Sequence, residues 1–431
     1  MQTASKKVIN GWAMYDWANS VYNLVITTTF FPAYYAAVTG PDNPAFKDGV
    51  PFLGRVFKNT ELKDYVLAIA FLIIAALSPI LSSIADYKGN KKNFMRFFCY
   101  LGAASCSVMY FFDGNHVTLG LVCFMLAGIG FYGSQVFYNS YLPDIASEKD
   151  MDRISAKGYS MGYIGSVIMQ MIGFAMVLFI THDKALPLKL TFLLVGIWWV
   201  AFAQITFKVL PISSKKERND KTHVLANGFK ELKIVWDQLK HMPVLKRYLG
   251  AFFFYSMGLQ TVMLVAIDFG IKELKLPNDK LIITAVIIQL VAILGAIAMS
   301  KLSTVFGNIR VLILTVLLWV GVCIAGYFIN TEMHFYILAS VVGLVMGGTQ
   351  SLSRSTYSKL MPETKDTASF FSFYDVTEKL AIVIGLFTFG IIEGVSTIRQ
   401  SILSLVVFFV LGFIMLLFTA AKEKQHSGNT N

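Results

Sequence analysis

The sequence predicts an all-α membrane protein whose twelve transmembrane helices form two halves of six. Three observations support this fold class: the length of the apolar runs, a basic stretch that divides them six and six, and motifs shared by the two sets. Each run is close to the roughly 20 residues that a helix needs to cross a bilayer core. Most runs also lack the polar face of a soluble helix. The runs lie at 12–38, 63–85, 94–112, 117–139, 156–181, 188–210, 247–271, 280–300, 310–330, 334–357, 368–394 and 400–421.

The basic residues predict the orientation of these helices. If both termini are cytoplasmic, the cytoplasmic segments hold 26 Lys and Arg residues, the other side holds 10, and Lys379 lies within a span. This asymmetry follows the positive-inside rule. It also explains the net charge of +11 without nucleic-acid binding, because no basic stretch has interleaved aromatic residues for base stacking. We therefore expect a multi-pass protein of a bacterial inner membrane, with cytoplasmic termini and basic loops near lipid headgroups.

The basic stretch also sets the expected domain boundaries. We expect an N-terminal six-helix half at 1–210, a cytoplasmic central loop at 211–246, a C-terminal six-helix half at 247–421 and a disordered tail at 422–431. Within the loop, a polar part is expected to be flexible and a following part to form an amphipathic helix on the membrane surface. A helix that binds a partner protein is the alternative. The two parts lie at 213–222 and 227–242.

The two halves share motifs at equivalent positions, which indicates an internal duplication. A shift of 219 residues aligns Gly128 with Gly347 and Pro143 with Pro362. These positions fall in the fourth and tenth spans and just after them. Two related six-helix units are an arrangement found in membrane transporters.

Cysteine and histidine positions give no sign of catalysis or metal binding. The four cysteines lie in apolar spans without metal-ligand spacing, so we expect neither disulfides nor metal ligands. The six histidines fall in loops or at span edges, and no hydrolase, zinc-protease or P-loop motif occurs. The sequence therefore predicts no enzyme, no catalytic residue, no metal site and no cofactor.

The link between the second and third spans carries a candidate gate motif at 82–92, with the sequence SSIADYKGNKK. It resembles the signature of the major facilitator superfamily, in which a small residue and an acid precede a glycine and a basic pair. The resemblance implies that Asp86 is tied to a nearby helix end and to basic groups such as Lys91-Lys92, which would hold the cytoplasmic gate shut. Gly89 would permit the tight reversal. In the second half Thr304 replaces the acid. An ordinary charged loop is the alternative.

The first span carries a more distinctive motif at 11–23, GWAMYDWANSVYN. It resembles the opening of the unknown-major-facilitator family, whose eukaryotic relatives are vacuolar amino-acid effluxers linked to autophagy. The likeness extends to segments at 30–32, 139–143 and 370–374 and covers most of the chain. It implies a major facilitator fold and export of small organic solutes such as amino acids. Glu378 departs from the pattern, because relatives tend to have a small residue there.

Polar residues in the first span are the first candidates for substrate or coupling sites. Asp16, Asn19, Ser20 and Asn23 lie on one face of the expected helix. Such a stripe must face the protein interior or a water-filled cavity. For Asp16, pairing with a basic loop residue at the helix end is the alternative to a coupling or gating role.

Span eleven carries three charged residues, Asp375, Glu378 and Lys379. An unpaired charge at the centre of a span costs about 2.5–3.5 kcal/mol on insertion scales. Asp375 and Lys379 have the i, i+4 spacing of an intrahelical ion pair. Glu378 then lacks a local base, so it could pair with Arg354 or carry a coupled proton. A structural ion network is the alternative.

The superfamily resemblance implies that spans one, four, seven and ten line a central cavity. An arginine in that cavity would favour a ligand with a carboxylate or phosphate, whereas a charge of the gate or loop is the alternative. The candidates from spans four, seven and ten are Gln135, Asn139, Gln260, Gln350 and Arg354.

Together these features predict a secondary active transporter that moves a small organic solute by alternating access, with proton-coupled export as the expected mode. The expected partners are the solute, protons and membrane lipids, and the expected state is a monomer. The alternatives are a lipid, amphiphile or drug exporter of the same fold, or a solute sensor that does not transport. A sensor would need a sizeable cytoplasmic signalling domain, and the central loop is too short to form one.

Overall fold

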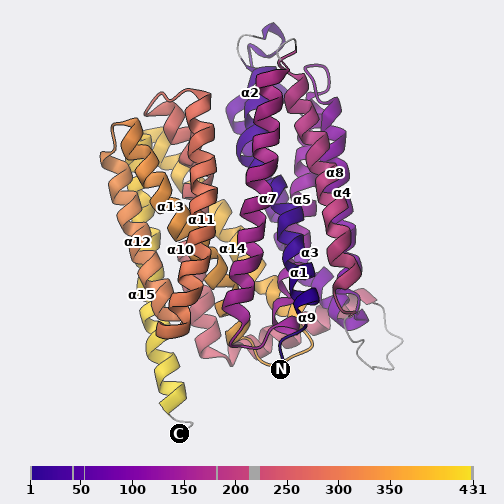
Figure 1. Cartoon of the computed structure of the whole chain (residues 1–431), viewed down its shortest axis with the longest axis vertical. Coiled ribbons are helices and arrows are strands. Elements are labelled where there is room, and N and C mark those ends of the chain that lie inside the picture. Colours follow the sequence, from indigo (N-terminus) through magenta and orange to yellow (C-terminus); the bar gives the residue numbers. More distant parts are fainter. Residues whose placement is uncertain (1, 41–42, 53, 181–182, 213–223, 429–431) are drawn as a thin grey trace.

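The computed structural model describes residues 2–40, 43–52, 54–180, 183–212 and 224–428. Long helices run side by side in two groups, and both chain termini lie at the same end of the bundle (Figure 1). We call this end the termini end, and it is the end that the charge asymmetry assigns to the cytoplasm. Within the described residues, ten helices are long and apolar enough to cross a membrane. The two other expected spans are the segmented first span and the charged eleventh, so the all-α membrane fold is confirmed.

The first half contains six spans, of which the first is made of three consecutive segments. A π-helix interrupts this span from Tyr22 to Phe30, and Pro32 follows in the first turn of the third segment. The spans are α1 (Lys6–Val21) with η1 (Tyr22–Phe30) and α2 (Phe31–Thr39), then α3 (Asn59–Lys88), α4 (Lys91–Val108), α5 (Val117–Asn139), α7 (Met151–Phe179) and α8 (Leu186–Val209). The short elements are η2 (Pro44–Phe46), the antiparallel strands β1 (Val50–Phe52) and β2 (Arg55–Phe57), η3 (Met109–Phe111) and α6 (Leu142–Ile145).

The second half repeats the six-span plan. The two halves meet mainly where α3 packs against α14 and where α7 packs against α11 and α13. The six helices are α10 (Pro243–Lys272), α11 (Asn278–Phe306), α12 (Asn308–Phe328), α13 (Glu332–Leu360), α14 (Thr367–Val395) and α15 (Ile398–Gly428).

Two expected boundaries differ from the structure. α10 begins at Pro243, four residues before the expected start of the second half, because proline favours the first turn of a helix and the basic residues Lys246 and Arg247 continue it. The expected disordered tail at 422–431 is wrong in its first part, since α15 stays helical to Gly428. Residues with good helix propensity, such as Lys422 and Glu423, continue the helix beyond the apolar span.

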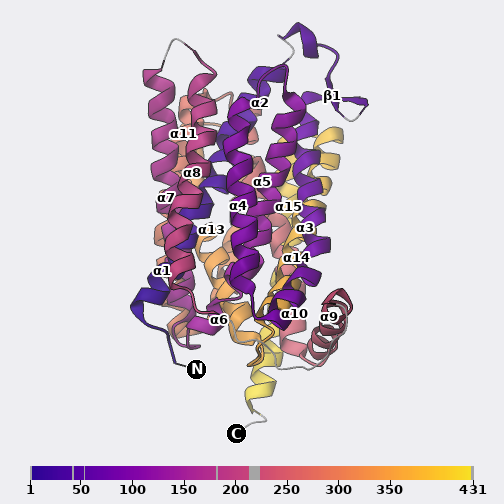
Figure 2. The same cartoon turned by 90° about the vertical axis from the view of Figure 1, so that its right-hand side faces the viewer.

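The central segment contains the expected amphipathic helix, α9 (Val224–Lys240). It lies beside the termini end and packs against α3, α10 and α14 (Figure 2). Val235 and Leu239 are buried, whereas Lys233 and Lys240 are exposed, as the amphipathic pattern predicts. The Trp236 ring stacks on Phe373 of α14 with centroids 5.7 Å apart. The polar part expected to be flexible, 213–222, lies outside the described residues.

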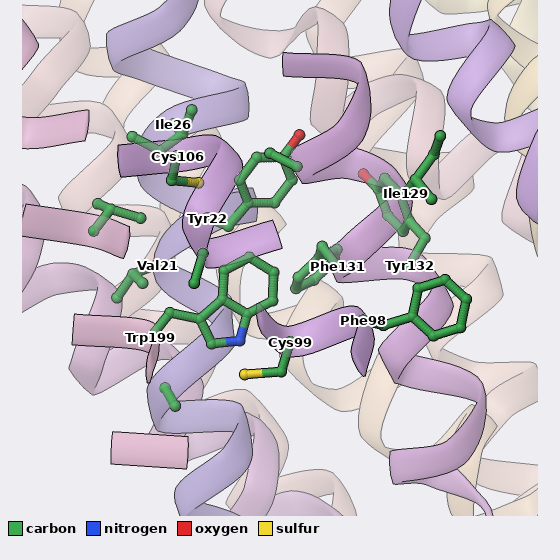
Figure 3. Packing of buried hydrophobic residues seen from close by; sticks show 14 of the residues in the cluster. Val21, Tyr22, Ile26, Phe98, Cys99, Cys106, Ile129, Phe131, Tyr132 and Trp199 are labelled. Carbon is green, nitrogen blue, oxygen red and sulfur yellow. The ribbon is translucent and has the colours of Figure 1, made fainter. Parts of the chain in front are cut away.

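The buried apolar residues form two clusters, one mostly in the first half and one mostly in the second. In the first half, aromatic rings from different spans meet around Trp199 of α8, with Tyr22 at a centroid distance of 6.0 Å and Phe131 at 6.3 Å (Figure 3). Cys99 and Cys106 lie in this core as small apolar side chains. All four cysteines are buried free thiols, in agreement with the sequence.

Candidate substrate cavity and gate

A cavity with polar walls lies between the two halves. The volume that the centres of water molecules can occupy in it is about 120 Å³. Since one water needs roughly 10–15 Å³, the cavity has room for several waters or a small solute. Eight of the predicted site residues line it: Asp16, Asn23, Gln135, Asn139, Gln260, Gln350, Glu378 and Lys379. The other lining residues are Ser20, Leu24, Thr28, Phe71, Phe131, Tyr132, Tyr159, Tyr163, Met263, Leu264, Met346, Tyr374 and Ile382.

Three predicted candidates do not line the cavity. Asn19 is fully buried, and its side chain has no hydrogen-bond partner among the described residues. Asp375 is buried and contacts Lys379, which does line the cavity. Arg354 is buried between the halves. The tyrosines of the wall were not predicted, because an apolar span with tyrosines is also typical of ordinary helix packing.

Arg354 ties the two halves together behind two residues of the cavity lining, Asp16 and Asn139. Its side chain is 1 % exposed and makes five hydrogen bonds, all to the first half. Two donate to Asp16 Oδ2 at 3.3 and 3.4 Å, one to Asn139 Oδ1 at 3.1 Å, and two to the Ser155 hydroxyl and carbonyl at 3.0 and 2.9 Å. The guanidinium has no further N–H group to offer. In this structure the Arg354 side chain lies outside the cavity lining with its N–H groups bonded to the first half, so the prediction that it contacts substrate stays a prediction.

The surroundings of Asp16 and Arg354 are fitted to this pair. A side chain at Gly158 would meet Asp16 Oδ2 at 2.4 Å and Arg354 at 2.8 Å, so only glycine leaves room there. Tyr138 donates a hydrogen bond to Asp16 at 2.7 Å, and Arg354 lies 4.8 Å from the Trp12 ring centroid. The basic partner of Asp16 is thus a helical residue of the other half. The predicted pairing with a loop residue is wrong.

The charged residues of α14 form one cluster at the cavity wall. Lys379 Nζ lies 3.0 Å from Asp375 Oδ1, as the i, i+4 spacing predicts, and 2.8 Å from Glu378 Oε2. Gln260 Nε2 of α10 donates to the other Glu378 oxygen at 2.9 Å. Glu378 therefore has a local base, and the expectation that it lacks one or pairs with Arg354 is wrong. Its side chain is 23 % exposed, whereas that of Lys379 is 2 % exposed.

Asp86 joins α3 of the first half to α14 of the second. It accepts hydrogen bonds from the Ala368 and Ser369 backbone N–H groups at 3.3 and 2.7 Å and from the Ser369 hydroxyl at 2.8 Å. These groups lie in the first turn of α14, where free N–H groups and the helix dipole favour an anion. Gly89, with φ of +65°, makes the reversal after α3. The motif is thus buried between helices, in contrast to an ordinary charged loop.

The basic pair of the motif has other partners than the resemblance implies. Lys91 pairs with Asp144 of α6 and donates to the Thr367 hydroxyl at 2.7 Å, which also joins the halves. Lys92 donates to the carbonyls of Phe207 and Leu210 at 3.2 and 2.5 Å, at the end of α8. Asp86 is therefore held by a helix end of the other half, and Lys91 makes a second contact beside it.

A second buried carboxylate joins the halves at the same end, and it was missed from the sequence. Asp152, in the first turn of α7, accepts hydrogen bonds from Ser303 at 2.9 Å, Asn308 at 2.7 Å and Lys359 at 2.6 Å, all of the second half. Asp152 thus places a carboxylate beside the link between α11 and α12, where Thr304 stands in the position that Asp86 has in the gate motif of the first half. An acid at the start of span five was the available signal, but its partners are more than 150 residues away.

Comparison with known proteins identifies the family. The model of the family "Vacuole effluxer Atg22 like" matches residues 4–428. The chain belongs to this family. A Bacillus subtilis (strain 168) protein described as an uncharacterized MFS-type transporter, YxiO, is 32% identical over 418 residues, covering 95% of this chain and 94% of that protein. Autophagy-related protein 22 of Kluyveromyces lactis is 26% identical over 458 residues, covering 94% and 92%.

Solved structures agree with the fold of this Atg22-like chain. The major facilitator transporter FucP in its outward conformation has a TM-score of 0.70 at 14% identity, with 96% of this chain and 98% of FucP covered. The human organic anion transporter MFSD10 has a TM-score of 0.71 at 13% identity, covering 95% and 98%. The chain is therefore a multi-pass membrane protein with the major facilitator fold, and its family relatives are transporters.

Proposed function

We propose that this protein is a secondary active transporter that exports a small organic solute by alternating access, with protons as the coupling ion. The observation that supports this most is the polar cavity between two halves that are tied together at the termini end. A site enclosed between two related halves can be exposed to one side at a time when the halves rock. The family description, a vacuole effluxer, supports export, and amino acids or related metabolites are the solutes that we propose.

The ties at the termini end support an outward-facing state. Asp86, Asp152 and the Lys91–Thr367 hydrogen bond connect the halves on that side, and Arg354 connects them next to the cavity. A change to the inward-facing state would have to break these contacts. Glu378 is our proposed proton carrier, because it is the carboxylate of the charged cluster that is most exposed to the cavity.

The alternatives have less support. A lipid or amphiphile exporter would be expected to have fewer polar cavity residues, whereas five amide side chains line this one: Asn23, Gln135, Asn139, Gln260 and Gln350. A solute sensor could have the same cavity. It would not need contacts between the halves that break in each transport cycle. Thermal-shift screening of the purified protein against amino acids, peptides, nucleosides and lysolipids should identify binders. Their flux in proteoliposomes then decides between transport, which we expect, and binding without flux, which would favour a sensor.

We expect the termini end to be cytoplasmic. Lys233→Cys on α9 and Lys47→Cys on the opposite side are both at exposed positions, and the four native cysteines are buried, so labelling of the added cysteines should dominate. In intact cells an impermeant maleimide should label Lys47→Cys and leave Lys233→Cys unlabelled until the cells are opened. The reverse pattern would show that the orientation is inverted.

We expect Asp86→Asn to lower transport turnover by about tenfold or more with little loss of folded protein. Hydrogen bonds to an ionised group contribute roughly 1.5–3 kcal/mol, and Asp86 makes them in only one of the two proposed states. Turnover at equal expression in proteoliposomes checks this. Asp150→Asn is the matched control, because it removes an ionised carboxylate whose partners all lie in the first half. Hydrogen bonds from Thr3 and Arg153 lower the pKa of Asp150 to about 2. Equal turnover of the two variants would remove the gate role.

A further inference from the structure

The charged groups around the cavity do not balance. Three carboxylates, Asp16, Asp375 and Glu378, face two cations, Arg354 and Lys379. With all five ionised, the site therefore has a net charge of −1. Asp16 pairs with Arg354, so the surplus lies in the cluster of Asp375, Glu378 and Lys379, where Glu378 is the more exposed carboxylate.

Neither cation is free to hold an anionic ligand. Arg354 uses its N–H groups on Asp16, Asn139 and Ser155. Lys379 is 2 % exposed, is paired with two carboxylates and lies 4.8 Å from the centroid of the Tyr132 ring. A ligand whose only charge is a carboxylate or phosphate would have to displace one of these contacts.

The exposed part of the cavity suits a cation instead. Glu378 is partly exposed, and each of its carboxylate oxygens has a second lone pair beyond the bonds to Gln260 and Lys379. Tyr163 and Tyr374 also line the cavity, and the faces of aromatic rings attract cations. The amide side chains can bind uncharged polar groups of a solute in either hydrogen-bond direction.

We propose that the cavity selects solutes that carry a protonated amine, with Glu378 as the residue that binds the ammonium group. This inference rests on the proposed transport function and names its substrate class. A zwitterion with an ammonium group is accepted through the same contact, but its carboxylate adds no cation contact. Solutes that are only anionic are excluded by the surplus negative charge.

The test uses four compounds with one side chain and four charge patterns: valinamide, valine, N-acetylvalinamide and N-acetylvaline. Binding to the purified full-length protein is measured at pH 7 by tryptophan fluorescence and thermal shift. Valinamide should bind tightest, about tenfold to a hundredfold tighter than N-acetylvalinamide, since a hydrogen bond to an ionised group contributes roughly 1.5–3 kcal/mol. N-acetylvaline should bind weakest.

Glu378→Gln should reduce the preference for valinamide over N-acetylvalinamide to about one. Glu393→Gln is the matched control on the same helix, because Glu393 pairs with Lys272 away from the cavity, and it should keep the preference. Three results would overturn the proposal: tighter binding of N-acetylvaline, no binding of either amine, or an unchanged preference in Glu378→Gln. The series on the wild-type protein decides the question even if Glu378→Gln does not fold.

The outcome separates this inference from the proposed function, because binding is measured without a membrane or a gradient. Binding of the amines without flux in proteoliposomes would contradict the transport function alone. Gradient-driven flux of an anionic solute would contradict the amine preference alone.

Discussion

Glu378→Gln is expected to abolish gradient-driven accumulation of solute while leaving exchange at saturating solute largely intact. The amide has the shape of the protonated acid and can still accept a hydrogen bond from Gln260, so the cavity keeps its form. It cannot release or take up a proton. Lys379 keeps Asp375 as its partner, so the substitution leaves no unpaired cation in the span. Net transport against a gradient needs the proton, whereas exchange of solute for solute does not.

The measurement is solute flux in proteoliposomes with and without an imposed pH gradient, at solute concentrations that compensate for weaker binding. Glu393→Gln should behave like the wild-type protein, because its carboxylate lies outside the cavity lining and pairs with Lys272. A Glu378→Gln protein that still concentrates solute against a gradient would falsify the coupling role. Equal loss of exchange and of net transport, with a lower folded yield, would assign Glu378 a structural role.

Arg354→Met is expected to cause the largest loss of stability, about 3–5 kcal/mol, because removing one partner of a buried ion pair leaves the other charge without compensation. Asp16 would keep the hydrogen bond from Tyr138 but lose its cation. Asn139 and the Ser155 carbonyl would each lose the hydrogen bond that Arg354 donates. The contact between residues 338 positions apart also ties the halves, so transport should be lost together with stability. Thermal unfolding in detergent measures the effect.

Two further variants show whether the effect comes from the pair. Arg310→Met makes the same chemical change at an exposed position and should leave the unfolding temperature close to that of the wild-type protein. Adding Asp16→Asn to Arg354→Met removes the unpaired carboxylate and should restore part of the loss. If the loss of stability in the double variant equals the sum of the losses in the two single variants, the two residues do not act as a pair.

Properties that depend on neighbouring residues were predictable from the sequence. The spans follow from runs of apolar residues, and the Asp375–Lys379 contact follows from spacing on one helix. The turn at Gly89 follows from a glycine between a helix end and a basic pair. Each of these depends on a few turns of chain, so the residues that decide it are visible together.

Partner choice between distant residues was not predictable in the same way. Arg354 and Glu378 are both charged residues of neighbouring spans, yet Arg354 pairs with Asp16 of the other half. The pairing depends on how α1, α7 and α13 meet and on the space that Gly158 leaves. Asp152 was missed for a similar reason, since a single acid at a helix start is common, and only packing brings Ser303 and Lys359 to it.

The central claim is that the two halves alternate around the cavity, and distances across both ends of α3 and α14 test it most directly. Spin labels at exposed positions 88 and 365 report the termini end, and labels at 64 and 395 report the opposite end. Double electron–electron resonance on proteoliposomes should show opposite changes at the two ends. Adding Asp86→Asn should lengthen the distance between positions 88 and 365 and shorten the distance between positions 64 and 395. One fixed distance at each end, unchanged by Asp86→Asn, pH or solute, would contradict alternating access in this protein.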